Sequence, residues 1–211
     1  MRLEELATDD LRQAAAYCDT LLFTCGGMAW RPAHLPVGTS WFILRKLRDS
    51  LETALGGRIV SLPVLGADVP DDDGALAVVS ADALRALLLR IIEQLRQYLT
   101  LRHIVLVTDS LHKEAALLDA LRGDRAGVAP VSFVWWRDGM AGGEEAAPAG
   151  FLPAGEMETS LLLAIAKRLV DMEQKSVQRY GASAAAGELG EEYWRRLQDA
   201  LRERIESAWR A

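Results

Sequence analysis

The chain has 211 residues, of which 50% are hydrophobic and 26% are charged, a balance typical of a globular protein and unlike that of a disordered or fibrous one. Lysine and arginine number 24 against 30 aspartate and glutamate residues, so the net charge of -6 leaves no basic surplus for nucleic acid. No apolar stretch approaches the ~20 residues of a membrane span, and the acidic N-terminus lacks the apolar segment of a secretory signal. We therefore expect one cytoplasmic domain over residues 1–211, with no nucleic-acid or membrane partner.

Apolar spacing in the first half of the chain predicts two helices and two strands. Thr8 is the expected N-cap of a helix with acidic residues in its first turn. The short apolar run 20–24 indicates a buried strand that leads into the glycine pair at 26–27. Residues 40–55 have the spacing of an amphipathic helix closed by two glycines, and residues 58–65 predict a second strand.

The second half of the chain repeats this alternation. An acidic turn at 70–74 precedes the strongest helix pattern, which Ser80 and Asp82 open. Residues 103–108 are continuously apolar and rich in β-branched side chains, as in a central parallel strand. The remaining predicted elements are a strand over 128–136, a surface loop over 139–150, a helix from Glu156 or Thr159 to about Leu169, and a last helix over 189–209.

This alternation predicts the fold class. Strands that alternate with helices of ten or more residues indicate βαβ units, so we predict an α/β fold, a three-layer α/β/α sandwich with a largely parallel sheet. In such sheets, ligands bind beyond the carboxyl ends of the strands. The segments expected to carry the chemistry are therefore 25–40, 108–114 and 135–159.

Common enzyme motifs are absent from the sequence. It has no GxGxxG, GxxxxGK[ST], HExxH or GxSxG pattern, and three histidines are too few for a histidine-rich metal site. The only cysteines, Cys18 and Cys25, are spaced like neither a redox pair nor a zinc site. We expect both thiols to be reduced and at least one to be packed in the core.

Two segments point to a known family. Residues 27–40 read GMAWRPAHLPVGTS, and residues 155–163 read GEMETSLLL. They resemble the creatininase (creatinine amidohydrolase) family, in which the corresponding segments read STEQHGPHLPLGTD and HAGExETSLML. Smaller similarities extend the resemblance over nearly the whole chain, at 2–6, 104–107, 135–136 and 187–190. The resemblance implies a creatininase-like fold and an oligomer, formed by copies of this chain or with a related subunit.

The resemblance fails at the positions that bind metal in the family. Family members hold two divalent metals with a glutamate, a histidine and an aspartate of the first segment and a histidine after the central strand. The resemblance places Ala29 at the glutamate, Arg31 at the first histidine and Ser40 at the aspartate. Ser110 takes the place of the later histidine, and Pro153 that of the histidine in HAGE. It therefore implies a site with no metal and no cofactor.

Arg31 changes the charge of the aligned site most. A cation at a metal position repels a nearby like charge by about 4 kcal/mol at ~4 Å and an effective dielectric constant of ~20. Arg31 could instead replace the metal and pair with Glu156 or Glu158, which would leave a packed pocket. The alternative is an ordinary surface arginine.

The predicted site residues are of two kinds. The catalytic candidates are His34, Ser110 and Glu156. The candidates for a ligand-binding pocket are Trp30, Arg31, Ser40, Asp109, His112, Trp135, Trp136 and Glu158. A structural role remains an alternative for each of them. His34 would hold the loop by hydrogen bonds, the glutamates would cap a helix, and the tryptophans would pack in the core or between subunits. Lys113 and Glu114 also follow the central strand, and the sequence does not choose an acid, a base or a nucleophile among these polar residues.

Three functions remain open. The leading hypothesis, which follows from the joint loss of the ligand positions, is a degenerate creatininase-like protein that acts as a binding or partner subunit with a vestigial small-molecule pocket. The second is a metal-independent enzyme that acts on an amide, lactam or related small molecule. The third is a metal-dependent cyclic-amide amidohydrolase whose ligands align differently or come from a partner chain.

Overall fold

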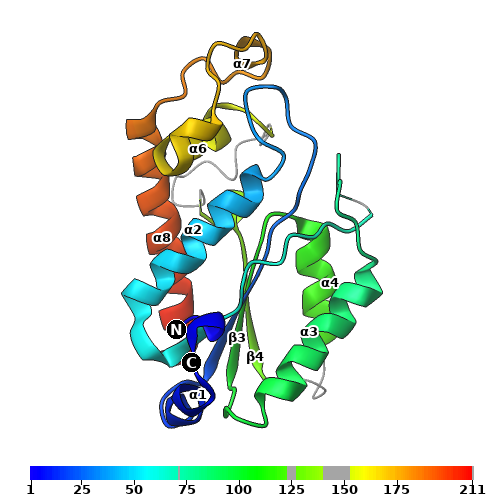
Figure 1. The fold of residues 1–211 in the computed structure, drawn as a ribbon, viewed down its shortest axis with the longest axis vertical. Helices are drawn as coiled ribbons and strands as arrows, with labels where there is room; N and C mark the ends of the chain where they lie inside the picture. Colours follow the sequence, from blue (N-terminus) through cyan, green and yellow to red (C-terminus); the bar gives the residue numbers. More distant parts are fainter. Residues whose placement is uncertain (71, 123–126, 140–152, 211) are drawn as a thin grey trace.

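A four-stranded parallel sheet forms the centre of the computed structural model, which describes residues 1–70, 72–122, 127–139 and 153–210 (Figure 1). The strands are β1 (Thr20–Cys25), β2 (Ile59–Ser61), β3 (His103–Thr108) and β4 (Ala129–Val134), in the order β2-β1-β3-β4. Every residue of β1 is buried, which explains why its sequence is a continuous apolar run without alternation. The predicted α/β fold with a parallel sheet is confirmed.

Helices cover both faces of this sheet (Figure 1). One face is covered by α2 (Thr39–Leu55), α6 (Glu156–Ala166) and α8 (Gly187–Arg210), and the other by α3 (Ala81–Leu95) and α4 (Leu111–Leu121). Alternate side chains of β1 serve the two cores, because Leu22 packs in the cluster with α2 and α8 whereas Phe23 packs in the cluster with α3 and α4. The short helices are α1 (Thr8–Ala14), α5 (Trp135–Asp138) and α7 (Ser176–Arg179), with 3-10 turns at Leu3–Glu5, Gly56–Arg58 and Lys167–Leu169. The three-layer prediction is also confirmed.

Two predicted strands are wrong at their ends. The strand expected over 58–65 forms a continuous ladder with β1 only over Ile59–Ser61, because Pro63 has no N–H to donate. The chain pairs with β1 once more through an isolated bridge between Leu65 and Cys25. The strand expected over 128–136 ends at Val134, where α5 begins. An apolar run alone does not distinguish strand from helix.

Three further predictions have different outcomes. Thr8 is the first residue of α1, and the N-cap is Ala7, whose N–H donates to the side chain of Asp10 at 3.0 Å. The loop expected over 139–150 lies, beyond Gly139, outside the described residues. Both cysteines are unpaired and buried. In the ranges that the structure describes, no helix is long and apolar enough to cross a membrane.

The carboxyl edge of the sheet carries the segments that matter for function. The first loop, residues 26–38, connects β1 to α2, and the short link Asp109–Ser110 connects β3 to α4. The acidic loop, described at residues 66–70 and 72–74, lies against the first loop. One backbone hydrogen bond joins these loops, from Trp30 N to Gly74 O at 2.7 Å, and Leu76 N, just after the acidic loop, donates to Met28 O of the first loop at 2.8 Å.

Candidate functional site

A cavity of about 260 Å³ opens at the carboxyl edge of the sheet. The pocket candidates that line it are Arg31, Ser40, Asp109, His112, Trp135 and Trp136, together with the catalytic candidate Ser110. Ala29 and Pro153 line it as well, so the four positions that the family resemblance aligned with metal ligands converge on one cavity, together with the position of the HAGE histidine. The cavity is also lined by Asp68, Asp72 and Asp73 of the acidic loop and by Lys113, for which the sequence predicted no specific role.

Arg31 enters this cavity from the first loop and pairs with a buried carboxylate. Its Nη2 atom donates to Oε1 of Glu158 at 3.1 Å and to Oγ of Ser40 at 3.2 Å. The side chain of Arg31 is 10% exposed and that of Glu158 is fully buried. The other oxygen of Glu158 accepts a hydrogen bond from Ala154 N at 2.6 Å. The ion pair between Arg31 and Glu158 therefore links the first loop to the start of α6.

A second cation, Lys113 on α4, lies at the floor of the cavity with only 1% of its side chain exposed. Its Nζ atom donates to Oδ1 of Asp109 at 2.7 Å and to Oδ1 of Asp68 at 2.8 Å, and Oδ2 of Asp72 lies 3.5 Å away. Burial lowers the pKa of Lys113, but the neighbouring carboxylates outweigh burial and raise it above its ordinary value. Lys113 is therefore a charged ammonium at neutral pH.

Gly27 allows this arrangement because it has no side chain. A Cβ atom added there would lie 1.7 Å from Oδ1 of Asp68, closer than any real contact. Its backbone N–H donates to Oδ2 of Asp109 at 2.8 Å. Glycine at this position thus permits the close approach of the first loop to the carboxylates.

Ser110 and His112 lie on the acidic side of the cavity. Ser110 is the N-cap of α4, where its Oγ accepts hydrogen bonds from His112 N and Lys113 N. Its hydroxyl donates to Oδ1 of Asp72. The His112 side chain is 57% exposed, and its Nδ1 lies 3.4 Å from the same carboxylate oxygen. The geometry gives Ser110 a capping role and brings an exposed imidazole to the rim.

The two tryptophans of α5 form one wall of the cavity. Trp136 donates from Nε1 to the backbone oxygen of Asp109 at 3.0 Å, whereas Trp135 is buried in the core with 1% exposure.

Cys25, at the end of β1, donates from Sγ to Ala67 O at 3.6 Å. Burial raises the pKa of this thiol to about 12, so it is protonated and unreactive at neutral pH.

Four predicted residues do not line the cavity, and one of them is Glu158, the buried partner of Arg31. His34 is fully buried, with Nδ1 2.9 Å from Ser176 Oγ and Nε2 3.0 Å from Ala154 O, so both ring nitrogens hold loops together. Glu156 accepts hydrogen bonds from Ser160 and from the hydroxyl of Tyr193 on α8, at 2.8 and 2.9 Å. Trp30 is 58% exposed. In the structure, His34 and Glu156 therefore have the contacts of structural residues.

The carboxylates around Lys113 carried only weak sequence signals. Asp109 and Lys113 are four residues apart across the start of a helix, a spacing that favours an ion pair. Asp68 lies 45 residues before Lys113, and Asp72 belongs to a segment whose composition indicated only a turn. Asp68 and Asp72 come close to Lys113 only in the folded chain, and no local sequence pattern indicates these contacts.

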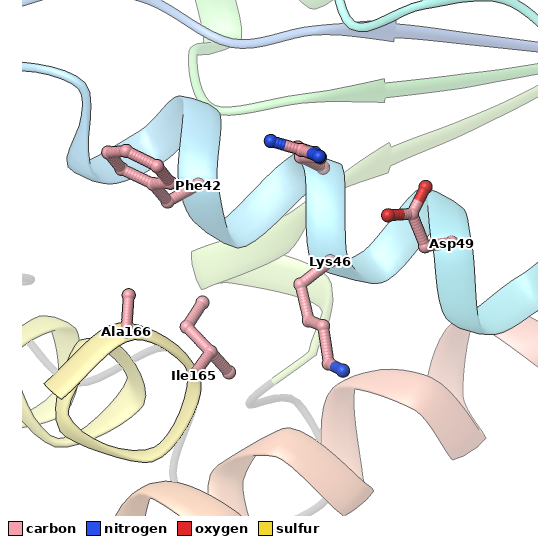
Figure 2. A pocket seen from close by; sticks show the side chains of 6 residues that line it. Phe42, Lys46, Asp49, Ile165 and Ala166 are labelled. Atoms are coloured by element: carbon pink, nitrogen blue, oxygen red, sulfur yellow. The ribbon is translucent and has the colours of Figure 1, made fainter.

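A second hollow lies away from this edge, between α2 and α6 (Figure 2). Phe42, Ile165 and Ala166 form its apolar end, and Lys46 and Asp49 lie toward the other end (Figure 2). None of the predicted site residues lines it. It is not at the ends of the strands, where ligands of parallel sheets bind, so we assign the candidate site to the first cavity.

Comparisons with known proteins agree with the fold. A family model described as creatinine amidohydrolase matches residues 4–207. A crystal structure of creatinine amidohydrolase (creatininase) is 17% identical and has a TM-score of 0.78, over 98% of this chain and 97% of that chain. A creatininase variant of the Zn-Zn type is 18% identical with a TM-score of 0.73, over 98% and 97%. A variant complexed with creatine is 19% identical with a TM-score of 0.72, over 98% of both chains. No curated protein matches the sequence.

Proposed function

Because the chain belongs to the creatininase family and two paired cations lie in its candidate site, we propose that it is a binding or partner subunit that works without a dinuclear metal centre. The observation that carries this proposal is the charge of the cavity. Arg31 and Lys113 both reach into it, and each is already neutralised by buried carboxylates.

The donor atoms at the aligned positions support the proposal. Two divalent cations need several anionic or imidazole ligands to replace their hydration, usually with a bridging carboxylate. The side chain of Ala29 has no ligand atom, and the Oγ of Ser40 accepts a hydrogen bond from Arg31. The Oγ of Ser110 is engaged in capping α4. These residues do not fit two divalent metals, and we derive no catalytic step through a metal.

The cavity retains features of a small-molecule pocket. Trp136 supplies an aromatic wall, and His112 and Asp73 supply polar groups at the exposed rim. We propose that a small ligand binds here, with Arg31 fixing one wall through its bond to Glu158. The partner would be another copy of this chain or a related subunit, and the proposed location is the cytoplasm.

One observation favours a second candidate, a metal-independent enzyme. The hydroxyl of Ser110 donates to Asp72, so a carboxylate is placed to accept its proton. The same Oγ also accepts two backbone hydrogen bonds, as a capping serine does. Loss of amide or lactam turnover in Ser110→Ala, with an unchanged fold, would favour the enzyme over the binding subunit.

The metal content of the purified chain tests the proposal directly. Elemental mass spectrometry is applied to protein prepared without chelator, and again after incubation with manganese and zinc followed by desalting. We expect far less than one metal per chain in both samples. Near two metals per chain would contradict the proposal and restore the metal-dependent amidohydrolase.

A further inference from the structure

Lys113 lies at the centre of three carboxylates that come from different parts of the chain. Asp109 follows β3, whereas Asp68 and Asp72 belong to the acidic loop. Each of them directs a carboxylate oxygen toward the ammonium, at 2.7, 2.8 and 3.5 Å respectively. The Lys113 side chain is 1% exposed, so the carboxylates surround a cation that is almost fully shielded from bulk water.

Backbone N–H groups hold these carboxylates in place. Oδ2 of Asp109 accepts from Gly27 N at 2.8 Å, and Oδ2 of Asp68 accepts from Met28 N at 2.9 Å. Asp72 accepts from Val69 N at 3.1 Å. The carboxylates thereby connect the ammonium to the first loop and to the acidic loop. Ligands oriented by outer hydrogen bonds in this way are typical of cation sites in proteins.

We propose that Lys113 is a tethered cation that occupies a three-carboxylate cation site and so positions the first loop and the acidic loop around the cavity. Removing the ammonium leaves a site of hard oxygen ligands, the kind that suits Mn²⁺ or Ca²⁺. The inference deepens the proposed function and rests on it in one respect, that the unaltered chain holds its pocket together without metal.

Arg31 provides a matched comparison within the same cavity. It is also a buried cation, but it faces the single carboxylate of Glu158 and the neutral Oγ of Ser40. Removing it leaves one negative charge, which is too few to hold a divalent cation in place of water. Variants at Arg31 and Lys113 both lose a buried cation, but only the variant at Lys113 is expected to open a cation site. Comparing them therefore distinguishes the two effects.

The test compares thermal unfolding of Lys113→Ala, Arg31→Ala and the unaltered chain in chelator-treated buffer, with and without millimolar Mn²⁺ or Ca²⁺. Without metal, we expect both variants to unfold at lower temperature than the unaltered chain. Added metal should raise the midpoint of Lys113→Ala by about 5 °C or more and shift the other two by less than about 1 °C. Isothermal titration with Mn²⁺ should give one site in Lys113→Ala.

Two results would overturn the inference: a Lys113→Ala midpoint that metal does not raise, or an equal rise in all three proteins. If Lys113→Ala does not fold alone, the test is repeated with Lys113→Ala/Asp72→Asn, which buries one negative charge fewer and keeps the two closest carboxylates. Failure of this variant to respond to Mn²⁺ overturns the inference as well. Stoichiometric metal in the unaltered chain would instead contradict the proposed function, so the two failures are distinct.

Discussion

The Nη2 atom of Arg31 lies 3.1 Å from Oε1 of Glu158, which is 127 residues later in the chain. Both side chains are buried, so removing either one leaves an uncompensated charge. We predict that Arg31→Met lowers the free energy of unfolding by about 3–5 kcal/mol, measured by urea denaturation.

A double-mutant cycle isolates this pair. In Arg31→Met/Glu158→Gln the remaining charge is gone, so the double variant should be more stable than the sum of the two single losses indicates. Strict additivity would show that the pair contributes nothing beyond its separate parts. A loss below about 1 kcal/mol in Arg31→Met would mean that Arg31 behaves like an exposed arginine.

Gly27 gives a second prediction. A Cβ atom at this position would overlap Oδ1 of Asp68, the oxygen that accepts from Lys113. Gly27→Ala must displace the first loop or the carboxylate, and we expect a loss of about 1–3 kcal/mol. Gly187→Ala is the matched control, because nothing lies within 4 Å of a Cβ at that position of α8. Equal stability of the two variants in urea denaturation would rule out the steric argument.

The sequence predicted those parts of the fold that have a local physical cause. The apolar runs of β1 and β3 and the 3–4 spacing of α3 show, within each segment, which of its residues are buried. Element ends were less predictable. The ladder between β2 and β1 is interrupted at Pro63 and returns only as an isolated bridge at Leu65, and the apolar run at Trp135 continues as a helix.

The location of the candidate cavity was predictable, but its contacts were only partly so. The rule for parallel sheets pointed to the edge where this cavity opens, and of the two partners considered for Arg31 the structure pairs it with Glu158. Glu156, two residues earlier, faces Tyr193 on α8 instead. Lys113 received no specific role because its carboxylate partner Asp68 lies 45 residues away, and one sequence carries no signal for that contact.

His34 gives a third prediction, on stability and not on chemistry. Both ring nitrogens form hydrogen bonds inside the protein, to Ser176 and to Ala154, and the ring is fully buried. His34→Ala leaves these partners unsatisfied and opens a cavity, so we expect a loss of about 2–4 kcal/mol. His112→Ala, at an exposed imidazole, should change stability by less than about 0.5 kcal/mol. Similar losses in the two variants, measured by urea denaturation, would contradict the structural role of His34.

The last prediction concerns acid stability and the ion pairs between α4 and α5. Arg137 donates from Nη1 and Nη2 to the two oxygens of Glu114, at 2.7 and 2.9 Å, and also bonds Asp138. Burial raises the pKa of Glu114, but the hydrogen bonds of Arg137 outweigh it, and the net pKa lies below its ordinary value. Burial likewise raises the pKa of Asp138, and its hydrogen bonds from Arg137 and Val134 N lower it further than burial raises it.

A carboxyl whose pKa is lower in the folded state contributes stability that is fully present above its unfolded pKa, about 4.3 for glutamate. That contribution disappears as the pH falls through the folded value. We therefore predict that the stability of the unaltered chain decreases steeply below about pH 4. Arg137→Met restores the pKa of Glu114 toward its ordinary value. This variant should be less stable at neutral pH and should lose less stability as the pH falls. Arg90→Met, which removes an exposed pair with Glu93, should leave the pH profile unchanged. Urea denaturation between pH 3 and 7 measures both profiles, and parallel profiles for Arg137→Met and the unaltered chain would assign the acid sensitivity to other carboxylates.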